Sequence, residues 1–389
     1  MTRSLLMVSN VAAFTRAFLL PYADHFRSLG WRVEALAHGI SGCETCKPHF
    51  DRVHDIGWSR EPFDLPGHVC GLRKVRSLTS NNQYDIIHVH TPIPGFLTRL
   101  ALAWPGARPK PAVVYTAHGF HFHPTNSWLR NQVFAKLEKL AGSWTDCLVT
   151  INPTDWKAAA ELRIVPRNRL LYMPGIGIDL SHFRPDAITP QAVQALRDAF
   201  GLRGNEPVFT MIAEFINRKR HRDALLALAQ MHHRTAHLML VGDGPNRESL
   251  RTLADKLGIR SRVHFAGVQS DVRPYILASR ATVLPSAQEG LPRCVMESLG
   301  CGVPVIGSDI RGTRDILKEG GGLLFPAGDE VALASQLDSV LENPGEAAKI
   351  GMAGRSQMSV YNLANVIREH ENLYARVTAR EAVERGRFV

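Results

Sequence analysis

Two glutamates stand at a spacing that could bring both carboxylates to one ligand. Glu289 follows an apolar run typical of a buried strand, and Gly290 behind it permits close approach of the backbone. Pro292 is a typical first residue of a helix, and Glu297 would lie on that helix. Carboxylates accept hydrogen bonds from hydroxyls, so this pair could bind a sugar and a ribose. Either glutamate alone could instead be a solvated or capping residue near a helix start.

Two further segments could contact phosphate groups. Gly242 and Gly244 lie between an apolar run and an amphipathic stretch, an arrangement that lets backbone N–H groups approach a phosphate at a helix N-terminus. Arg218 and Lys219 belong to a basic cluster that could also be the solvated start of a helix. The glycine turn could equally be an ordinary strand-to-helix connection. The full dinucleotide fingerprint and the Walker pattern are both missing from the sequence, which counts against NAD and ATP.

A histidine is the candidate site residue of the N-terminal half. His118 follows a predicted strand and precedes Gly119, so we expect it at the carboxyl edge of that strand. His88 and His90 alternate on another predicted strand and could line either the core or the site. Neither these histidines nor Cys43 and Cys46 have the complete spacing of a metal site, so we predict no metal. No cofactor is predicted either.

Length and composition restrict the class of protein. The chain has 389 residues, 45% hydrophobic and 21% charged, which predicts a globular protein of about two domains. A net charge of +10 favours an anionic partner such as a phosphate-bearing substrate, an anionic membrane or a nucleic acid. The basic residues are not interleaved with aromatic ones, so we do not expect nucleic acid to be bound. No apolar run approaches the roughly 18 residues of a membrane span. We therefore expect a cytoplasmic protein with reduced cysteines.

Short apolar runs alternate with amphipathic stretches, which is typical of parallel strands joined by helices. The fold class is therefore predicted as α/β, with two doubly wound Rossmann-like domains facing across a cleft. We expect an N-terminal domain at 1–180, a linker at 181–205, a second domain at 206–360 and a final helix at 361–389 that crosses back to the first domain. The predicted strands are 5–8, 32–37, 86–90, 112–116, 147–151, 208–213, 238–241, 262–266, 281–284, 303–306 and 322–325.

The segment 285–306 resembles the signature of the retaining GT-B glycosyltransferases of glycosyltransferase family 4, in which two glutamates precede Gly-x-Pro-Val. The segments 242–245 and 265–278 match that family in order and spacing. The segments 115–122 and 174–179 resemble its exopolysaccharide and capsule branch. The likeness extends over most of the chain.

The resemblance implies roles for individual residues. Glu289 would contact the donor sugar, Glu297 the ribose and Lys219 the diphosphate, where its ammonium would stabilise the departing nucleotide. His118 would hydrogen-bond the donor sugar. Further residues would complete the nucleotide-sugar site. They are Gly242 and Gly244 with the amides of the glycine turn, Gly290 and Leu291 with the amides of the helix start, the neighbouring Arg218, and Val268 in the loop beside the base. Two features depart from the family pattern: Glu214 stands where an arginine is common, and the segment 9–13 lacks a glycine pair.

The resulting hypothesis is a retaining, metal-independent glycosyltransferase of the hexosyltransferase class. It would move a sugar from a nucleotide diphosphate, with UDP expected, to a glycan or polyprenyl-diphosphate-linked acceptor in bacterial surface polysaccharide synthesis. A basic amphipathic helix predicted at 128–141 suits the inner face of an anionic plasma membrane, although it could simply pack on its sheet. The alternatives are a UDP-sugar 2-epimerase of related fold and a non-catalytic nucleotide-sugar-binding protein.

Overall fold

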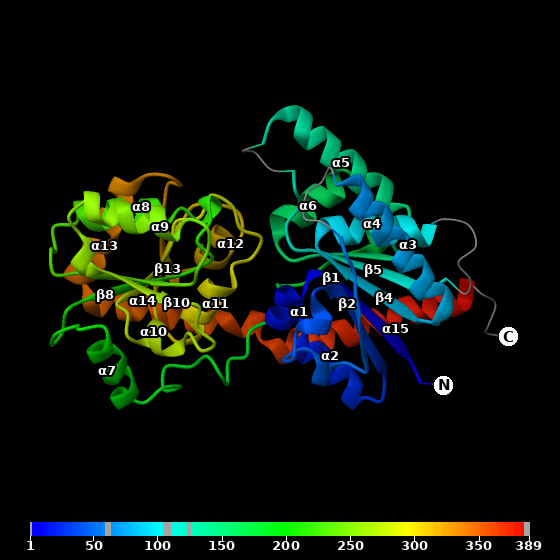
Figure 1. Ribbon diagram of the computed structural model, residues 1–389, viewed down its shortest axis with the longest axis horizontal. Coiled ribbons are helices and arrows are strands. Elements are labelled where there is room, and N and C mark those ends of the chain that lie inside the picture. The colour runs from blue at the N-terminus through cyan, green and yellow to red at the C-terminus, as the bar shows by residue number, and fades with distance from the viewer. Residues whose placement is uncertain (1, 59–63, 104–109, 123–125, 385–389) are drawn as a thin grey trace. The chain divides into compact units, whose positions relative to one another are not determined.

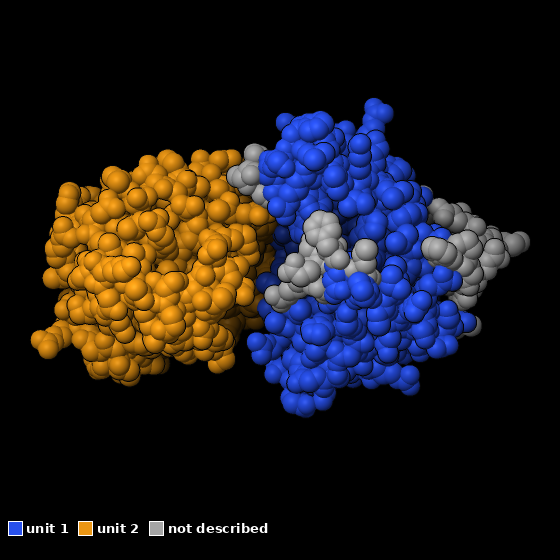
Figure 2. Space-filling view, turned by 45° about the horizontal axis from the view of Figure 1, so that its top comes forward, with its two compact units in different colours: residues 1–176, 366–389 blue, residues 177–365 orange. Residues whose placement is uncertain are grey.

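The computed structural model describes residues 2–58, 64–103, 110–122 and 126–384. The chain divides into two compact units (Figure 2). The first unit contains residues 1–176 and 366–389, and the second contains residues 177–365. Each unit is built around one sheet and has its own hydrophobic core.

The first unit contains a seven-stranded parallel sheet in the order β3-β2-β1-β4-β5-β6-β7 (Figure 1). Its strands are β1 Ser4–Val11, β2 Arg32–His38, β3 Arg52–Asp55, β4 Ile86–His90, β5 Ala112–Ala117, β6 Cys147–Thr150 and β7 Leu170–Tyr172. The connecting helices are α1 Ala12–Phe18, α2 Leu20–Ser28, α3 Leu65–Asn81, α4 Pro92–Ala103, α5 Trp128–Gly142 and α6 Pro153–Glu161. The strand order reverses between β1 and β4, and such a reversal opens a crevice at the carboxyl ends of a parallel sheet.

The second unit contains a six-stranded parallel sheet in the order β10-β9-β8-β11-β12-β13. Its strands are β8 Val208–Ile212, β9 His237–Val241, β10 Val263–Gly267, β11 Ala281–Leu284, β12 Val305–Ser308 and β13 Gly322–Phe325. Its helices are α7 Pro190–Ala199, α8 His221–Gln230, α9 Arg247–Lys256, α10 Arg273–Leu277, α11 Arg293–Gly300, α12 Thr313–Leu317, α13 Glu330–Glu342 and α14 Pro344–Gln357. Figure 1 shows α8 and α9 on one face of this sheet and α10 on the other. The order reverses between β8 and β11, so the loops after these two strands meet.

The last helix, α15 Leu363–Glu384, begins in the second unit and continues in the first. In the first unit Tyr374 is buried against Phe26, with ring centroids 4.8 Å apart. The hydroxyl of Tyr374 forms a hydrogen bond of 2.6 Å with Nδ1 of His88. The residues at 181–205 include α7 and belong to the second unit.

The predicted α/β class with two Rossmann-like domains is confirmed by these sheets. The edge strands β3 and β7 were not among the predicted strands. Among the described residues, no helix is both long and apolar enough to span a membrane.

Candidate functional site

The loops that follow β8 and β11 bring Lys219 and Glu289 together. Lys219 lies in a short 3₁₀ turn, Asn217–Lys219, and its Nζ is 2.5 Å from Oε1 of Glu289. Both side chains are largely buried, with 15% and 9% exposed. Since β8 and β11 are neighbours at the reversal of strand order, their loops must share this space. The two loops therefore place a largely buried ammonium beside a carboxylate. They do so at the carboxyl edge of the sheet, where open α/β sheets bind ligands.

Arg218 links the loop after β8 to the loop after β11 through hydrogen bonds. Its Nη1 donates to the carbonyl of Gln288 at 2.9 Å and lies 3.7 Å from Oε2 of Glu289. The amide of Ala287 donates back to the Arg218 carbonyl at 2.9 Å. Glu289 therefore has two cationic side chains within 4 Å. The side chain of Glu214, which stands where the family commonly has an arginine, is exposed.

Glu297 lies on α11, where it is buried and paired within its own helix. Nε of Arg293, four residues earlier, is 2.7 Å from Oε1 of Glu297. Burial raises the pKa of Glu297, and the nearby Arg293 guanidinium opposes that rise. Burial also raises the pKa of the neighbouring Cys294 thiol to about 12, which makes this cysteine a poor nucleophile at neutral pH. Gly290 and Leu291 are half-buried in the turn that leads into α11.

The glycine turn after β9 packs against the loop after β8. Gly242 and Gly244 have φ of 141° and 156°, a region that favours glycine. A Cβ on Gly242 would collide with the carbonyl oxygen of Ala213, and one on Gly244 would meet the backbone of Phe215 at 2.8 Å. Both glycines therefore permit close packing of two loops. Val268, just after β10, is 72% exposed.

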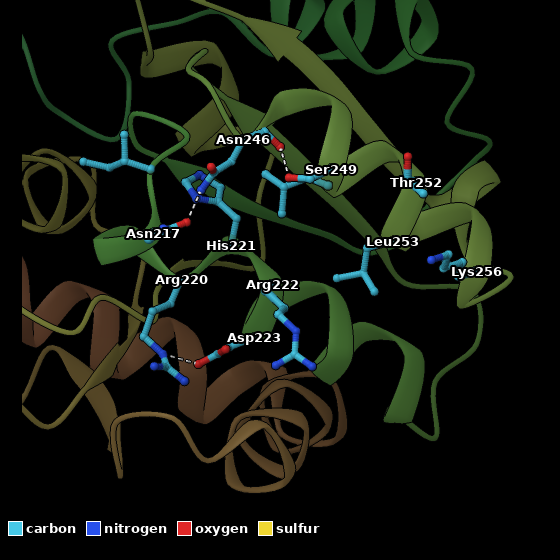
Figure 3. A pocket seen from close by; sticks show the side chains of 12 residues that line it. Asn217, Arg220, His221, Arg222, Asp223, Asn246, Ser249, Thr252, Leu253 and Lys256 are labelled. Atoms are coloured by element: carbon cyan, nitrogen blue, oxygen red, sulfur yellow. Dashed lines mark hydrogen bonds and ion pairs between the residues drawn. The ribbon is translucent and has the colours of Figure 1, made fainter.

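A pocket of about 660 Å³ lies between the start of α8 and α9 (Figure 3). Figure 3 shows Asn217 and Asn246 directed at each other and Arg220 directed at Asp223. Their hydrogen bonds measure 2.8 Å and 2.6 Å. None of the predicted site residues lines this pocket. It adjoins the Lys219 loop through Asn217.

In the first unit, His118 belongs to a cluster with His88, His90 and His370, which we call the histidine cluster. His118 follows β5, and its Nε2 is 3.1 Å from Nδ1 of His90 at the end of β4. Burial and the nearby His370 lower the pKa of His118 to about 3. Burial also lowers the pKa values of the other three, in the case of His370 to about 4. All four rings are therefore neutral at pH 7. In the described part of the chain, no three His, Cys, Asp or Glu side chains are arranged to hold a metal ion.

Comparison with known proteins establishes the family. The family model "Glycosyl transferases group 1" matches residues 193–357, and "Glycosyltransferase Family 4" matches residues 18–181. A Bacillus subtilis protein named "Putative glycosyltransferase EpsD" is 34% identical over 381 residues, covering 96% of this chain and 97% of the relative. The chain belongs to the group 1 glycosyltransferases. The Escherichia coli UDP-Gal:alpha-D-GlcNAc-diphosphoundecaprenol alpha-1,3-galactosyltransferase is 29% identical over 252 residues, 64% of this chain and 63% of that one.

Solved structures share the fold of this glycosyltransferase. Anabaena HepE in complex with UDP aligns with a TM-score of 0.79 and 18% identity, covering 97% of this chain and all of HepE. Sucrose-phosphate synthase from Thermosynechococcus elongatus aligns with a TM-score of 0.81 and 20% identity, covering 97% and 100%. At these identities the likeness establishes the GT-B fold.

The structure brings some of the residues predicted for the glycosyltransferase's site into contact in the second unit. Lys219, Arg218 and Glu289 are in contact, and the turn with Gly290 and Leu291 joins Glu289 to the helix that carries Glu297. His118 belongs to the first unit. Arg293 was not among the predicted site residues, although its i, i+4 spacing from Glu297 is a recognisable signal for an ion pair.

Proposed function

We propose that this glycosyltransferase moves a hexosyl group from a UDP-sugar to a lipid-linked glycan acceptor, with retention of anomeric configuration. The observation that carries the proposal is the Lys219–Glu289 pair at the reversal of the second sheet. A buried ammonium can neutralise the charge that develops on a departing diphosphate without a metal ion. A neighbouring carboxylate can accept hydrogen bonds from sugar hydroxyls.

The other predicted residues complete the proposed donor site. Glu297 would accept hydrogen bonds from the ribose hydroxyls, and Arg218 would add positive charge near the diphosphate. The amides of Gly290 and Leu291 would face the sugar or its phosphate. Gly242 and Gly244 would border the nucleotide and Val268 the base. The UDP complex of HepE and the UDP-Gal donor in the name of the E. coli relative support UDP as the nucleotide.

The proposed reaction is an attack on the same face from which the nucleotide leaves. The acceptor oxygen forms a bond to the anomeric carbon while the bond from that carbon to the phosphate oxygen breaks. The acceptor proton goes to the departing phosphate, and His118 would hydrogen-bond the sugar. Retention through a covalent intermediate requires a carboxylate nucleophile. Glu289 is already engaged by Lys219 and Arg218, which favours an electrostatic role for it.

The acceptor is proposed to be a polyprenyl-diphosphate-linked glycan of bacterial surface polysaccharide synthesis. The name of the E. coli relative includes a diphosphoundecaprenol-linked acceptor, and the EpsD relative covers 96% of the chain. Such an acceptor stays at the membrane, so the enzyme would contact the inner face of the plasma membrane as a peripheral protein.

Helix α5 is the surface proposed for that membrane contact. Glu138 points inward, where Nη2 of Arg99 is 3.0 Å from its Oε2. The helix also exposes Leu129, Val133, Leu137 and Leu140, at spacings of three and four residues that form one stripe. Lys136 beside this stripe is also exposed. An apolar stripe flanked by cations is typical of helices that lie in anionic interfaces.

Vesicle binding tests the membrane contact. The double variant Val133→Ser, Leu137→Ser should no longer sediment with phosphatidylglycerol vesicles, whereas the wild type should. Val331→Ser, which alters an exposed valine on α13, should bind as the wild type does. Equal sedimentation of all three proteins would contradict the role of α5.

A transfer assay tests the function itself. Purified enzyme in EDTA is supplied with radiolabelled UDP-sugars and with membranes that contain polyprenyl-linked glycans. Label in the lipid fraction, with the anomeric configuration of the donor shown by NMR of the product, supports the proposal. Formation of a C2-epimerised sugar, free or still linked to UDP, without added acceptor would indicate the epimerase alternative. Donor binding without turnover of any donor and acceptor would indicate a binding protein.

A further inference from the structure

The histidine cluster contains a direct hydrogen bond between two neutral imidazoles, His90 and His118. Two neutral rings can share a hydrogen bond only if one nitrogen donates and the other accepts. Nε2 of His118 is occupied by this bond at 3.1 Å, so Nδ1 is the nitrogen of His118 left for a ligand. If His90 Nδ1 donates, His118 must be protonated at Nδ1 and present a donor there. If His90 Nδ1 accepts, His118 presents an acceptor.

The ring of His90 is itself held by its neighbours on the strands. It stacks on His88, with centroids 4.2 Å apart and an angle of 29° between the planes. His88 is fixed by both of its ring nitrogens, at 2.7 Å from Oγ1 of Thr116 and 2.6 Å from the hydroxyl of Tyr374. Residues from β4, β5 and α15 therefore determine the plane in which His90 can meet His118.

His118 is also confined on its other side. The ring of Phe14, on α1, meets it edge-on with centroids 5.0 Å apart and 74° between the planes. Across the cluster, Nδ1 of His370 is 2.8 Å from the Val366 carbonyl. A carbonyl can only accept, so His370 carries its proton on Nδ1. The groups named around the cluster are thus aromatic rings, hydroxyls and neutral imidazoles, which keep the rings of the cluster uncharged at neutral pH.

We propose that His90 is a positioning residue that sets the ring orientation and the tautomer of His118. Through this bond the tautomer of His90 determines whether Nδ1 of His118 meets a sugar hydroxyl as a donor or as an acceptor. The consequence for transfer rests on the proposed function, in which His118 contacts the donor sugar. The hydrogen bond and the tautomer do not depend on that function.

Three variants separate positioning from simple support of the core. His90→Phe keeps a ring in the cluster but removes the nitrogen. His90→Asn retains a polar group close to the position of Nδ1. His370→Phe disturbs the same cluster without removing the His90–His118 bond, and it serves as the matched control. Thermal unfolding of each variant reports how much stability the substitution costs.

The decisive readout is the ring ¹⁵N spectrum of histidine-labelled full-length protein, with His118 assigned from the spectrum of His118→Asn. We expect one neutral tautomer of His118 in the wild type and His370→Phe, and a mixture in His90→Phe. Loss of one orienting hydrogen bond should lower kcat about tenfold with little change in donor KM, and His90→Asn should recover most of it. An unchanged His118 spectrum in His90→Phe would overturn the proposal, as would equal losses of kcat in His90→Phe and His370→Phe. If the wild type transfers no sugar, the proposed function fails, while the spectra alone still decide the role of His90.

Discussion

Nζ of Lys219 lies 2.5 Å from Oε1 of Glu289, although the two residues are 70 positions apart in the chain. Their contact follows from the order of the second sheet, which places β8 beside β11 and so brings the two following loops together. In the proposed reaction the Lys219 ammonium would move from the Glu289 carboxylate toward the diphosphate of the donor. The Glu289 carboxylate would then accept hydrogen bonds from the sugar hydroxyls.

Replacing Glu289 with glutamine should impair transfer much more than nucleotide binding. The amide preserves shape but removes the charge that pairs with Lys219 and the acceptor strength offered to the sugar. We expect kcat to fall about 100-fold or more, the size of effect seen when one stabilising group of an active site is removed. The affinity for UDP should stay within about threefold, because Lys219 is retained. Kinetics and calorimetry measure the two quantities.

The wild type also tests same-face attack, with Glu289→Gln as the sample that lacks the carboxylate. Mass spectrometry of enzyme quenched during turnover should show no sugar attached to Glu289. An isolable glycosyl adduct on this residue would replace the proposed route with a double displacement.

Glu297 should be recognisable by its dependence on the ribose hydroxyls. A hydrogen bond to a charged acceptor contributes about 1.5–3 kcal/mol, so deoxyribose analogues of UDP should bind at least about tenfold more weakly than UDP. In Glu297→Ala this discrimination should disappear, since the group that detects the missing hydroxyl is gone. Arg293→Ala serves as the comparison, because it removes the partner of Glu297 but leaves the carboxylate. Equal discrimination by Glu297→Ala and the wild type would remove Glu297 from the ribose site.

Acid should destabilise the first unit through its buried histidines. Burial lowers the pKa of His370 from its ordinary value of 6.5 to about 4 in the folded protein. Between these two values the unfolded chain binds the proton and the folded one does not, so stability is lost as pH falls through about 6.5 and is retained above it. Each such histidine contributes at most about 1.4 kcal/mol per pH unit in this window. Urea unfolding at pH 7.5 and pH 5 should therefore show a clear decrease in the free energy of unfolding.

The variant His370→Phe isolates one part of that pH dependence. It removes one buried imidazole, so the loss of stability between pH 7.5 and pH 5 should be smaller than in the wild type. A slope identical to that of the wild type would show that His370 is not neutral in the folded state at pH 5.

The glycine turn after β9 makes a prediction about stability. Gly242→Ala places a Cβ against the Ala213 carbonyl at a φ of 141°, so it should destabilise the second unit by roughly 2 kcal/mol or more. Gly345→Ala is the matched control, because nothing lies within 4 Å of its added Cβ and alanine favours the helix α14. A Gly242→Ala protein as stable as the control would mean that the turn after β9 can move away from the loop after β8.

The central strands of both sheets and the edge strands of the second sheet could be predicted from the sequence, whereas β3 and β7, the edge strands of the first sheet, could not. Central strands of a parallel sheet are covered on both faces and appear as continuous apolar runs, as in the segment 281–284. The edge strand β3, Arg52–Asp55, contains an arginine, a histidine and an aspartate and is only half covered. β3 pairs with β2 through its backbone, and the side chains of β3 form no hydrophobic pattern that the sequence could reveal.

Residue types at the candidate site could be predicted, but their contacts could not. A motif places Glu289 after a strand and Lys219 in a basic loop, yet only the sheet order shows that the two side chains meet. His88 and His90 were left open between core and site. The structure shows them buried, with His90 bonded to His118, because the carboxyl ends of β4 and β5 are adjacent. Local spacing cannot supply such contacts between separate elements.

The most direct test of the account is calorimetric titration of UDP into the enzyme in EDTA, comparing the wild type, Lys219→Ala and Lys349→Ala. Lys349 is an exposed lysine on α14, 79% accessible, and controls for the loss of one positive charge. The account predicts that the wild type and Lys349→Ala bind UDP equally without metal. It also predicts that Lys219→Ala binds at least about tenfold more weakly, since a charged contact to phosphate is lost. Unchanged binding by Lys219→Ala, or binding that requires a divalent cation in the wild type, would contradict the proposed metal-independent diphosphate site.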